Sequence, residues 1–159
     1  MISMIVAMSA DRVIGYKGGL PWHIPADLKN FKRLTTDNVV VMGRTTFESL
    51  PMKGGLPNRV NIVLTRGEHP ESTNVVRYVS SLDFNQLREI SDLSNREVFI
   101  IGGANVYAQA FPHVDRVYLS LVKGCAVGDT YFPDVDWYDF RKTHDEDCGD
   151  YVYRIMDRV

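Results

Sequence analysis

Four short runs of almost wholly apolar residues recur along the chain, and this recurrence restricts the possible folds more than any other feature. The runs are Ile2–Met8, Val39–Met42, Ile62–Leu64 and Val98–Ile101, and each ends at a polar or glycine-containing turn. Valine and isoleucine dominate them. Runs of this length that are apolar on both faces are typical of central strands covered by helices on each side.

Helical patterns separate these runs, and strand alternating with helix favours a parallel α/β sheet. The predicted helices are Pro25–Leu34, Thr46–Leu50, Leu82–Ile90 and Asn105–Phe111. Towards the C-terminus, Val117–Val122 and Tyr151–Met156 look like an antiparallel strand pair joined by a long loop. We therefore predict one α/β domain over residues 1–159. Its mixed, mostly parallel sheet has about eight strands, an antiparallel C-terminal edge and about four flanking helices.

Composition and charge narrow the classes of partner. The 159 residues can close a hydrophobic core, and 18 basic against 20 acidic residues leave a net charge of −2. This balance gives no general attraction to nucleic acid or to a membrane surface. Two cysteines and four scattered histidines show no spacing typical of a metal site. We expect no metal, a cytoplasmic location and a monomer, and we interpret the apolar N-terminal run as a buried strand rather than a membrane span.

Three of the predicted strands end in residues that suit anions. The strand ends are followed by Gly43-Arg44-Thr45-Thr46, Thr65-Arg66 and Gly102-Gly103-Ala104-Asn105. In an open α/β sheet all three lie along the carboxyl edge, where nucleotides bind. A single junction of this kind is usually only a tight turn, and the GxGxxG fingerprint is absent. Three junctions with two arginines nevertheless indicate a dinucleotide with a terminal phosphate, which favours NADP over NAD.

Asp27 is the second signal. An aspartate in the first turn of a helix usually serves only that helix end. Here Ile24, Asp27, Phe31 and Leu34 fall on one helical stripe. A carboxylate in an apolar stripe is either partnered or held at a raised pKa, and both situations indicate function. The preceding segment, Gly15–Trp22, is either an ordinary surface loop or a lid over that carboxylate.

Several motifs resemble, in order and across the whole chain, those of bacterial dihydrofolate reductases of the chromosomal type. They are Val13–Gly15, Leu20–Leu28, Phe31–Lys32, Met42–Ser49, Pro57–Arg59, Ile101–Tyr107, Gly128–Thr130 and Phe132–Pro133. The resemblance implies that NADPH transfers hydride to the pterin ring of dihydrofolate, while N5 of the pterin is protonated, to give tetrahydrofolate for one-carbon metabolism.

The same resemblance implies roles for individual residues. Asp27 is the catalytic carboxylate, supported by Ser120, and Trp22 and Leu20 complete the catalytic site from the lid. Arg59 pairs with the glutamate tail of the substrate. The substrate pocket also contains Ile5, Val6, Ala7, Leu28, Phe31, Ser49, Leu50, Ile101 and Tyr107. The cofactor contacts are Ala7, Ile14, Gly43, Arg44, Thr45, Thr46, Leu64, Thr65, Arg66, Ile101, Gly102, Gly103, Ala104, Asn105, Val106 and Tyr107. The Gly102–Gly103 peptide is cis in the family.

Two residues depart from the family pattern, and two other functions remain open. The family often has a basic residue in place of Asn105 and a tryptophan in place of Asn30. One alternative is the related NADPH-dependent reductase of riboflavin biosynthesis, against which Asp27 and Arg59 argue. The other is a non-catalytic nucleotide-binding module. Oxidation of NADPH when dihydrofolate is added discriminates the prediction from both.

Overall fold

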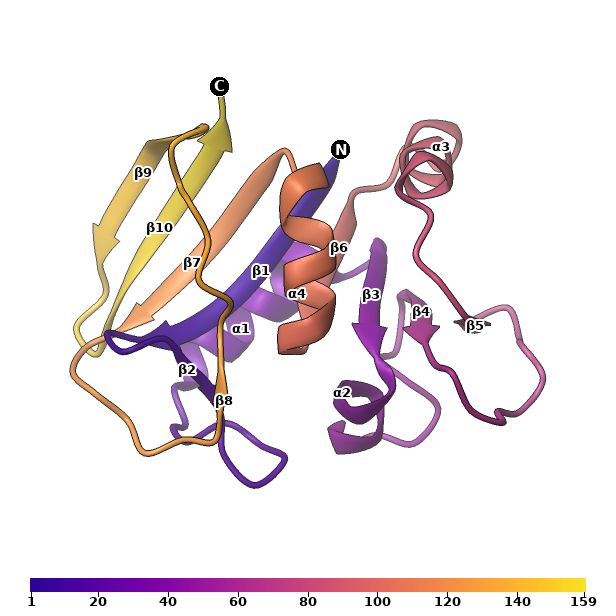
Figure 1. Cartoon of the computed structure of the whole chain (residues 1–159), viewed down its shortest axis with the longest axis horizontal. Helices are drawn as coiled ribbons and strands as arrows, with labels where there is room; N and C mark the ends of the chain where they lie inside the picture. Colours follow the sequence, from indigo (N-terminus) through magenta and orange to yellow (C-terminus); the bar gives the residue numbers. More distant parts are fainter.

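An eight-stranded sheet runs through the centre of the computed structural model, which describes residues 1–159 (Figure 1). The strand order is β5-β4-β3-β6-β1-β7-β10-β9. The strands are β1 (Ile2–Ser9), β3 (Val39–Gly43), β4 (Val60–Leu64), β5 (Val76–Val79), β6 (Val98–Gly102), β7 (Arg116–Val122), β9 (Phe140–Asp147) and β10 (Tyr151–Arg158). The first six strands of this order, from β5 through β4, β3, β6 and β1 to β7, pair in parallel, whereas β10 is antiparallel to both β7 and β9. The predicted mixed sheet with an antiparallel C-terminal edge is confirmed.

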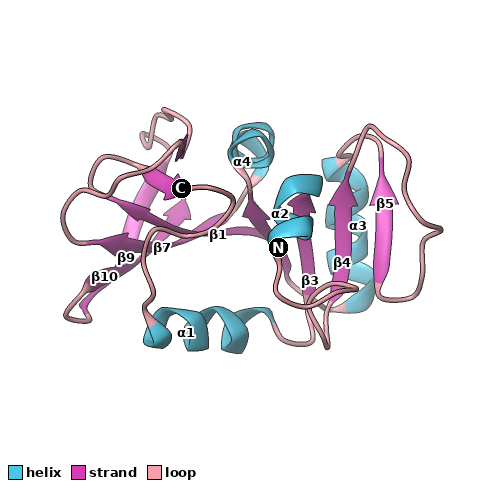
Figure 2. Cartoon of the chain, turned by 90° about the horizontal axis from the view of Figure 1, so that it is seen from below, coloured by secondary structure: helices cyan, strands magenta, loops and turns pink.

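Helices cover both faces of the sheet, as the doubly apolar strands require. They are α1 (Pro25–Thr35), α2 (Arg44–Ser49), α3 (Phe84–Ser94) and α4 (Ala104–Ala110), followed by the short 3-10 helix η1 (Phe111–His113). Helices α1 and α4 lie on opposite sides of the sheet (Figure 2). Within β3, Val39 and Val41 join a core of 19 buried residues on the α3 and α4 side. Val40 and Met42 join a core of seven on the α1 and α2 side.

The helix ends follow local chemistry that apolar spacing alone does not reveal. Helix α3 begins two residues later than predicted because the carboxylate of Asp83 accepts the Gln86 N–H at 3.1 Å and caps it. It ends at Asn95, which has the left-handed conformation common at helix C-termini. Helix α1 starts at Pro25, as predicted, and runs one residue further. None of the helices combines the length and apolar character needed to cross a membrane.

The expectation of a strandless loop before Tyr151 is wrong. Residues Phe140–Asp147 form β9, which pairs with β10 with one register shift, between Ile155 and Met156. Seven of its eight residues are exposed and most are charged, so the strand shows no apolar alternation. Charged, exposed strands are a usual form of sheet edge because they discourage pairing with another chain. The short strand β5 at the opposite edge was likewise not predicted.

A separate two-stranded sheet holds the segment before α1. Strand β2 (Val13–Gly15) pairs antiparallel with β8 (Thr130–Tyr131), although the two are far apart in sequence. The pairing ties the start of an exposed loop, which leads into α1, to a distant part of the chain. The position of this loop bears on the site described below.

Candidate active site

Parallel pairing brings the three glycine- or arginine-containing junctions together, as expected. Gly43 at the end of β3 pairs with Leu64 at the end of β4, and Met42 pairs with Gly102 at the end of β6. A Cβ placed on Gly43 would lie 4.0 Å from both the Gly102 oxygen and the Gly103 nitrogen. The Gly102–Gly103 peptide is cis, as the resemblance implies. The turns that start α2 and α4 thus adjoin one another at the carboxyl edge.

These turns leave backbone N–H groups free to bind an anion. Gly43 and Gly103 are the N-cap residues of α2 and α4, and neither helix start has a side-chain cap. A Cβ on Gly103 would meet only the Thr46 hydroxyl, at 3.5 Å. Uncapped N–H groups on glycine turns are a usual way to hold phosphate. The residue types at this edge therefore fit the pyrophosphate of a dinucleotide.

The arginine predicted to recognise a terminal phosphate lies beside its predicted neighbour. Arg44 donates from Nη1 to the Thr65 hydroxyl at 3.3 Å and to the Glu68 carbonyl at 3.1 Å. Its Nε pairs with Glu48 at 2.7 Å. Arg66 follows directly on Thr65 and is exposed, without an ion pair. Two cations and a hydroxyl thus gather at the ends of β3 and β4.

Asp27 lies on the inner face of α1 and is only partly open to solvent. Ser120, on β7, donates its hydroxyl to Asp27 Oδ1 at 2.5 Å. Phe31 and Leu34, on the same stripe, pack against the core of the α1 side. Burial raises the pKa of Asp27, and the Ser120 hydrogen bond opposes that rise without cancelling it. Asp27 forms no ion pair, so its charge is not neutralised by the protein.

A cavity of about 360 Å³ opens beside this carboxylate. Its lining includes Leu20 and Trp22 from the predicted lid and Leu28 from α1. His23 and Ile24 complete it. The indole Nε1 of Trp22 is buried and has no hydrogen-bond partner in the protein. Apolar walls with one carboxylate and an unused donor are typical of a site for a flat, partly polar molecule.

Arg59 is a buried cation without an anion. Only 6% of it is exposed, and its one side-chain hydrogen bond is from Nη2 to the Thr36 hydroxyl at 3.4 Å. Its Nε is buried without a partner, and burial lowers the pKa of the guanidinium. A buried charge is costly unless something pairs with it. The arrangement therefore fits a carboxylate that comes from a ligand.

The loop carrying Arg59 is held by Asn61, a residue that was not predicted to belong to the site. The Asn61 amide donates to the carbonyls of Leu56, Arg59 and Val75 at 3.0, 3.2 and 3.1 Å, and its oxygen accepts the Leu56 N–H. Thr36, the partner of Arg59, is likewise not predicted. An asparagine inside the apolar strand Val60–Leu64 is a signal that could have been used, because a buried amide needs several partners.

The predicted lid is tied down at its base. Asp129 accepts the Lys17 N–H at 3.0 Å through its side chain and donates its own N–H to the Gly15 carbonyl at 3.0 Å. Gly128 lies so close to β2 that a Cβ there would overlap the side chain of Val13. Beyond these ties the chain forms no further helix or strand until α1, and it leads directly to Leu20 and Trp22 in the cavity wall.

The remaining predicted residues divide between the two faces of the sheet. Ile5, Phe31, Leu50 and Ile101 pack on the side that carries Asp27. Ala7 and Ser49 are not buried, and neither are Gly43, Thr45, Thr46, Ala104 and Asn105 at the carboxyl edge. The side chains of Val6, Val106 and Tyr107 belong to the other core, against which Ile14 and Leu64 also pack. The Val6 and Val106 side chains are buried, although Val106 Cγ2 lies close to the Gly43 turn, and the Tyr107 hydroxyl is engaged with the Ile5 carbonyl at 2.8 Å.

Comparison with known proteins connects this geometry to one family. The family described as dihydrofolate reductase matches residues 1–154. A dihydrofolate reductase of Bacillus subtilis (strain 168) is 42% identical over 138 residues, which cover 86% of this chain and 77% of that protein. Dihydrofolate reductase type 3 of Salmonella typhimurium is 40% identical over 92% of this chain and 90% of its own length.

A solved structure agrees with the sequence relatives. Dihydrofolate reductase from Enterococcus faecalis, complexed with NADP(H) and RAB-propyl, superposes with a TM-score of 0.80 at 32% sequence identity. The match covers 99% of this chain and 96% of the other. The likeness therefore extends over the sheet, the helices and both ends of the chain.

Proposed function

The chain belongs to the dihydrofolate reductase family, and we propose from this premise that it reduces dihydrofolate to tetrahydrofolate with NADPH. The observation that carries the proposal is that the protein holds two charges of opposite sign, each without a partner in the protein. Asp27 is a part-buried carboxylate without a cation, and Arg59 is a buried cation without a carboxylate. Dihydrofolate offers a partner to each, because a polar pterin ring and a glutamate tail stand at its two ends.

The residues at the carboxyl edge fit NADPH, which supplies the hydride when bound. We propose that the turns at Gly43–Thr46 and Gly102–Asn105 hold the pyrophosphate, and that Arg44, Thr65 and Arg66 hold the additional phosphate. The uncapped N–H groups and the Arg44–Thr65 contact support this assignment. Arginine suits a terminal phosphate because its planar donors pair with two oxygens at once.

Asp27 acts on the pterin by binding and orienting it. Its carboxylate accepts hydrogen bonds from the pterin amino group and N3, while the Ser120 hydroxyl fixes the rotamer of Asp27. Because burial raises the pKa of Asp27, the group exchanges protons closer to neutral pH than an exposed aspartate does. Leu20 and Trp22 cover the ring and limit access of bulk water. The proton reaches N5 through a water molecule within the closed site, while Asp27 orients and polarises the ring.

Arg59 contributes to substrate specificity by binding a part of the substrate that lies far from the reacting atoms. It pairs with the α-carboxylate of the glutamate tail, while Leu28, which lines the cavity beside Asp27, and Phe31 and Leu50, which pack on the same side of the sheet, contribute to the substrate pocket. Binding energy gained far from the reacting atoms positions the ring for hydride transfer. The buried, unpaired guanidinium supports this role.

The direct test is the loss of NADPH absorbance when dihydrofolate is added to the purified protein. We expect turnover with dihydrofolate and none with the ribosylated pyrimidine that riboflavin-type reductases reduce. Turnover of the pyrimidine alone would move the chain to that activity. NADPH binding without turnover of either substrate would leave a nucleotide-binding module and overturn the proposal.

We also propose that the enzyme works as a single domain and as a cytoplasmic monomer. Two free, exposed cysteines are compatible with a reducing compartment. No set of three or more histidine, cysteine, aspartate or glutamate side chains is placed to hold a metal ion. Light scattering at working concentration measures the mass directly, and a value near twice 18.1 kDa would contradict the monomer.

A further inference from the structure

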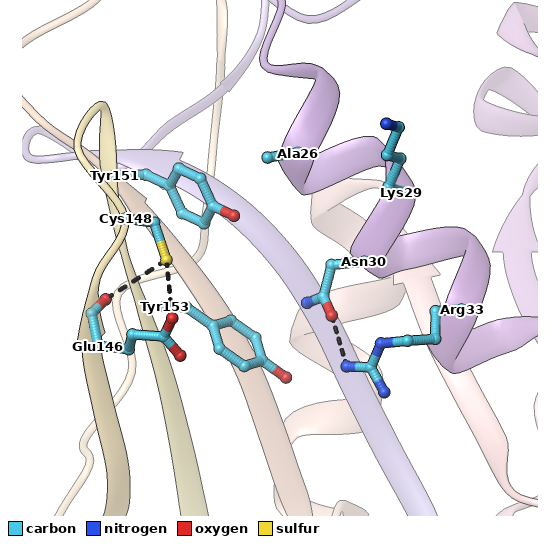
Figure 3. A pocket seen from close by; sticks show the side chains of 8 residues that line it. All are labelled: Ala26, Lys29, Asn30, Arg33, Glu146, Cys148, Tyr151 and Tyr153. Atoms are coloured by element: carbon cyan, nitrogen blue, oxygen red, sulfur yellow. Dashed lines mark hydrogen bonds between the residues drawn. The ribbon is translucent and has the colours of Figure 1, made fainter.

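A second cavity, of about 340 Å³, lies between α1 and the β9–β10 hairpin (Figure 3). It shares no lining residue with the cavity beside Asp27. Lys29, Asn30 and Arg33 line it from the helix, and Tyr151 and Tyr153 line it from β10. The proposed reaction uses none of these five side chains, so the cavity is distinct from the proposed substrate and cofactor sites, although Asp27 lies close enough to act on Tyr151.

The helix side of this cavity carries positive charge that the protein does not neutralise. Neither Lys29 nor Arg33 takes part in any ion pair. The guanidinium of Arg33 donates only to Asn30 Oδ1, at 2.6 Å, which holds it along the cavity wall (Figure 3). The one acidic residue in the lining, Glu146, is engaged by His144 at 3.3 Å and by the Cys148 thiol at 3.7 Å. Within the lining, two cations outnumber the one engaged acid, and Asp27, which also acts on Tyr151, does not line the cavity; this balance favours a ligand with a single negative charge.

The strand side of the cavity is aromatic. Tyr151 and Tyr153 are two residues apart on β10, so their rings project from the same face, and their hydroxyls point towards α1 (Figure 3). Tyr153 also packs edge-on against His144, with ring centroids 5.6 Å apart, which fixes its orientation. Burial, with smaller contributions from Cys148 and Asp27, raises the pKa of Tyr151 to about 12. Its hydroxyl therefore keeps its proton at neutral pH and can donate to an anion.

We propose that this cavity is a second ligand site, which takes a small aromatic carboxylate. The ring of the ligand packs against the two tyrosines, and its carboxylate pairs with the planar donors of Arg33 and with Lys29 at the rim. The cavity volume is at the low end of the range for small-molecule sites, roughly 300–1,000 Å³, and so suits a small ligand.

The chain carries its own reporter for this site. Cys148 lines the cavity and is exposed, whereas Cys125 is equally free and exposed but does not line it. Benzoate is the probe, and iodoacetamide alkylation of each cysteine is followed by mass spectrometry at constant ionic strength. A ligand of this size binds with a dissociation constant of about 1–10 mM. Benzoate at five times that constant should slow alkylation of Cys148 about sixfold, by mass action, while Cys125 reacts at an unchanged rate.

Matched controls separate this site from the substrate site. Neutral benzamide should protect Cys148 far less than benzoate does. Arg33→Gln should remove the protection, and Arg33→Lys should retain part of it, because the charge stays while the planar fork is lost. Arg59→Gln should leave the protection intact. Equal slowing of both cysteines, equal protection by benzamide, or loss of protection in Arg59→Gln alone would each overturn the proposal.

Discussion

Two opposing effects act on the charge of Asp27. Its carboxylate sits in a partly buried position that disfavours charge, and a single serine hydroxyl offsets only part of that cost. Asp27→Asn keeps the shape and removes the charge. We expect hydride transfer to dihydrofolate at neutral pH to fall by about 100-fold or more, as for loss of a general acid group. Activity should partly return at low pH, where the substrate protonates more readily. Single-turnover kinetics measure the effect, and an unchanged rate would remove Asp27 from the mechanism.

The same substitution should stabilise the fold. Because the pKa of Asp27 is raised in the folded protein, the unfolded chain loses this proton first as the pH rises above the ordinary value of 3.8. Stability then falls with rising pH through the window up to the folded pKa, and it stays lower above that window. Asp27→Asn lacks this loss, so its unfolding midpoint should exceed that of the parent at neutral pH. The difference should vanish under acid conditions where Asp27 is protonated in both the folded and the unfolded protein. Urea titrations at several pH values would contradict this if the parent were the more stable protein at neutral pH.

Arg59 acts on affinity rather than on chemistry. Arg59→Lys keeps a cation but loses the planar pair of donors that matches a carboxylate. We expect the KM for dihydrofolate to rise about tenfold or more, while NADPH affinity is unchanged. A dihydropterin without the glutamate tail provides the control, because both proteins should reduce it equally well. Equal losses on the two substrates would mean that Arg59 supports the structure instead.

At the level of elements, the sequence predicts those whose residues must be buried. The central strands β1, β3, β4 and β6 are apolar on both faces, so their existence follows from the sequence alone. Edge strands bury little and are not recognisable in this way. Five of the eight residues of β9 are charged, and its pairing depends on β10 being present beside it.

The residues of the candidate site likewise divide into those that could be predicted from the sequence and those that could not. The turns at the strand ends and Asp27 could be predicted from the sequence pattern, because glycines and a lone carboxylate are distinctive beside apolar residues, whereas the role of Arg59 was predicted only from the family resemblance. The sheet face on which a side chain lies could not be assigned from the family motif alone: the side chains of Val6, predicted to contact substrate, and Val106, predicted to contact cofactor, both belong to the core on the α3 and α4 side. Contacts between distant segments, such as Thr36 with Arg59, depend on the folded chain and leave no local signal.

Substitution of Gly128, which packs against β2, tests whether close packing anchors the lid. A Cβ on Gly128 would overlap Val13 Cγ1 and lie 2.8 Å from the Gly15 oxygen, so Gly128→Ala must displace β2. We expect a loss of about 1–3 kcal/mol in unfolding free energy, typical of overpacking, together with slower turnover. Gly19→Ala, in the same lid, meets no atom within 4 Å and should change stability by less than about 0.5 kcal/mol. Urea unfolding compares the two, and equal effects would contradict close packing as the cause.

In the whole molecule, residues far apart in the sequence meet because β1 lies in the middle of the sheet. Asp27 and Arg59 precede and follow β3, and Ser120 lies on β7, on the other side of β1. The site therefore forms only when the parallel strands are arranged in this order, so it exists only in the folded state. A ligand that spans the carboxyl edge must then stabilise the entire fold.

This linkage gives a test of cofactor choice that does not depend on turnover. NADPH at about a hundred times its dissociation constant should raise the unfolding free energy by about 2.7 kcal/mol, which raises the Tm of a chain of this size by roughly 5–10 °C. NADH at the same concentration should give a smaller shift because it lacks the phosphate that Arg44 and Arg66 are proposed to hold. Replacing both arginines with alanine should reduce the NADPH shift to that of NADH and leave the NADH shift unchanged, since each charge-assisted contact contributes about 1.5–3 kcal/mol. If the two cofactors lose their effect equally, the arginines serve the pyrophosphate or the fold, and preference for NADPH must come from elsewhere along the edge.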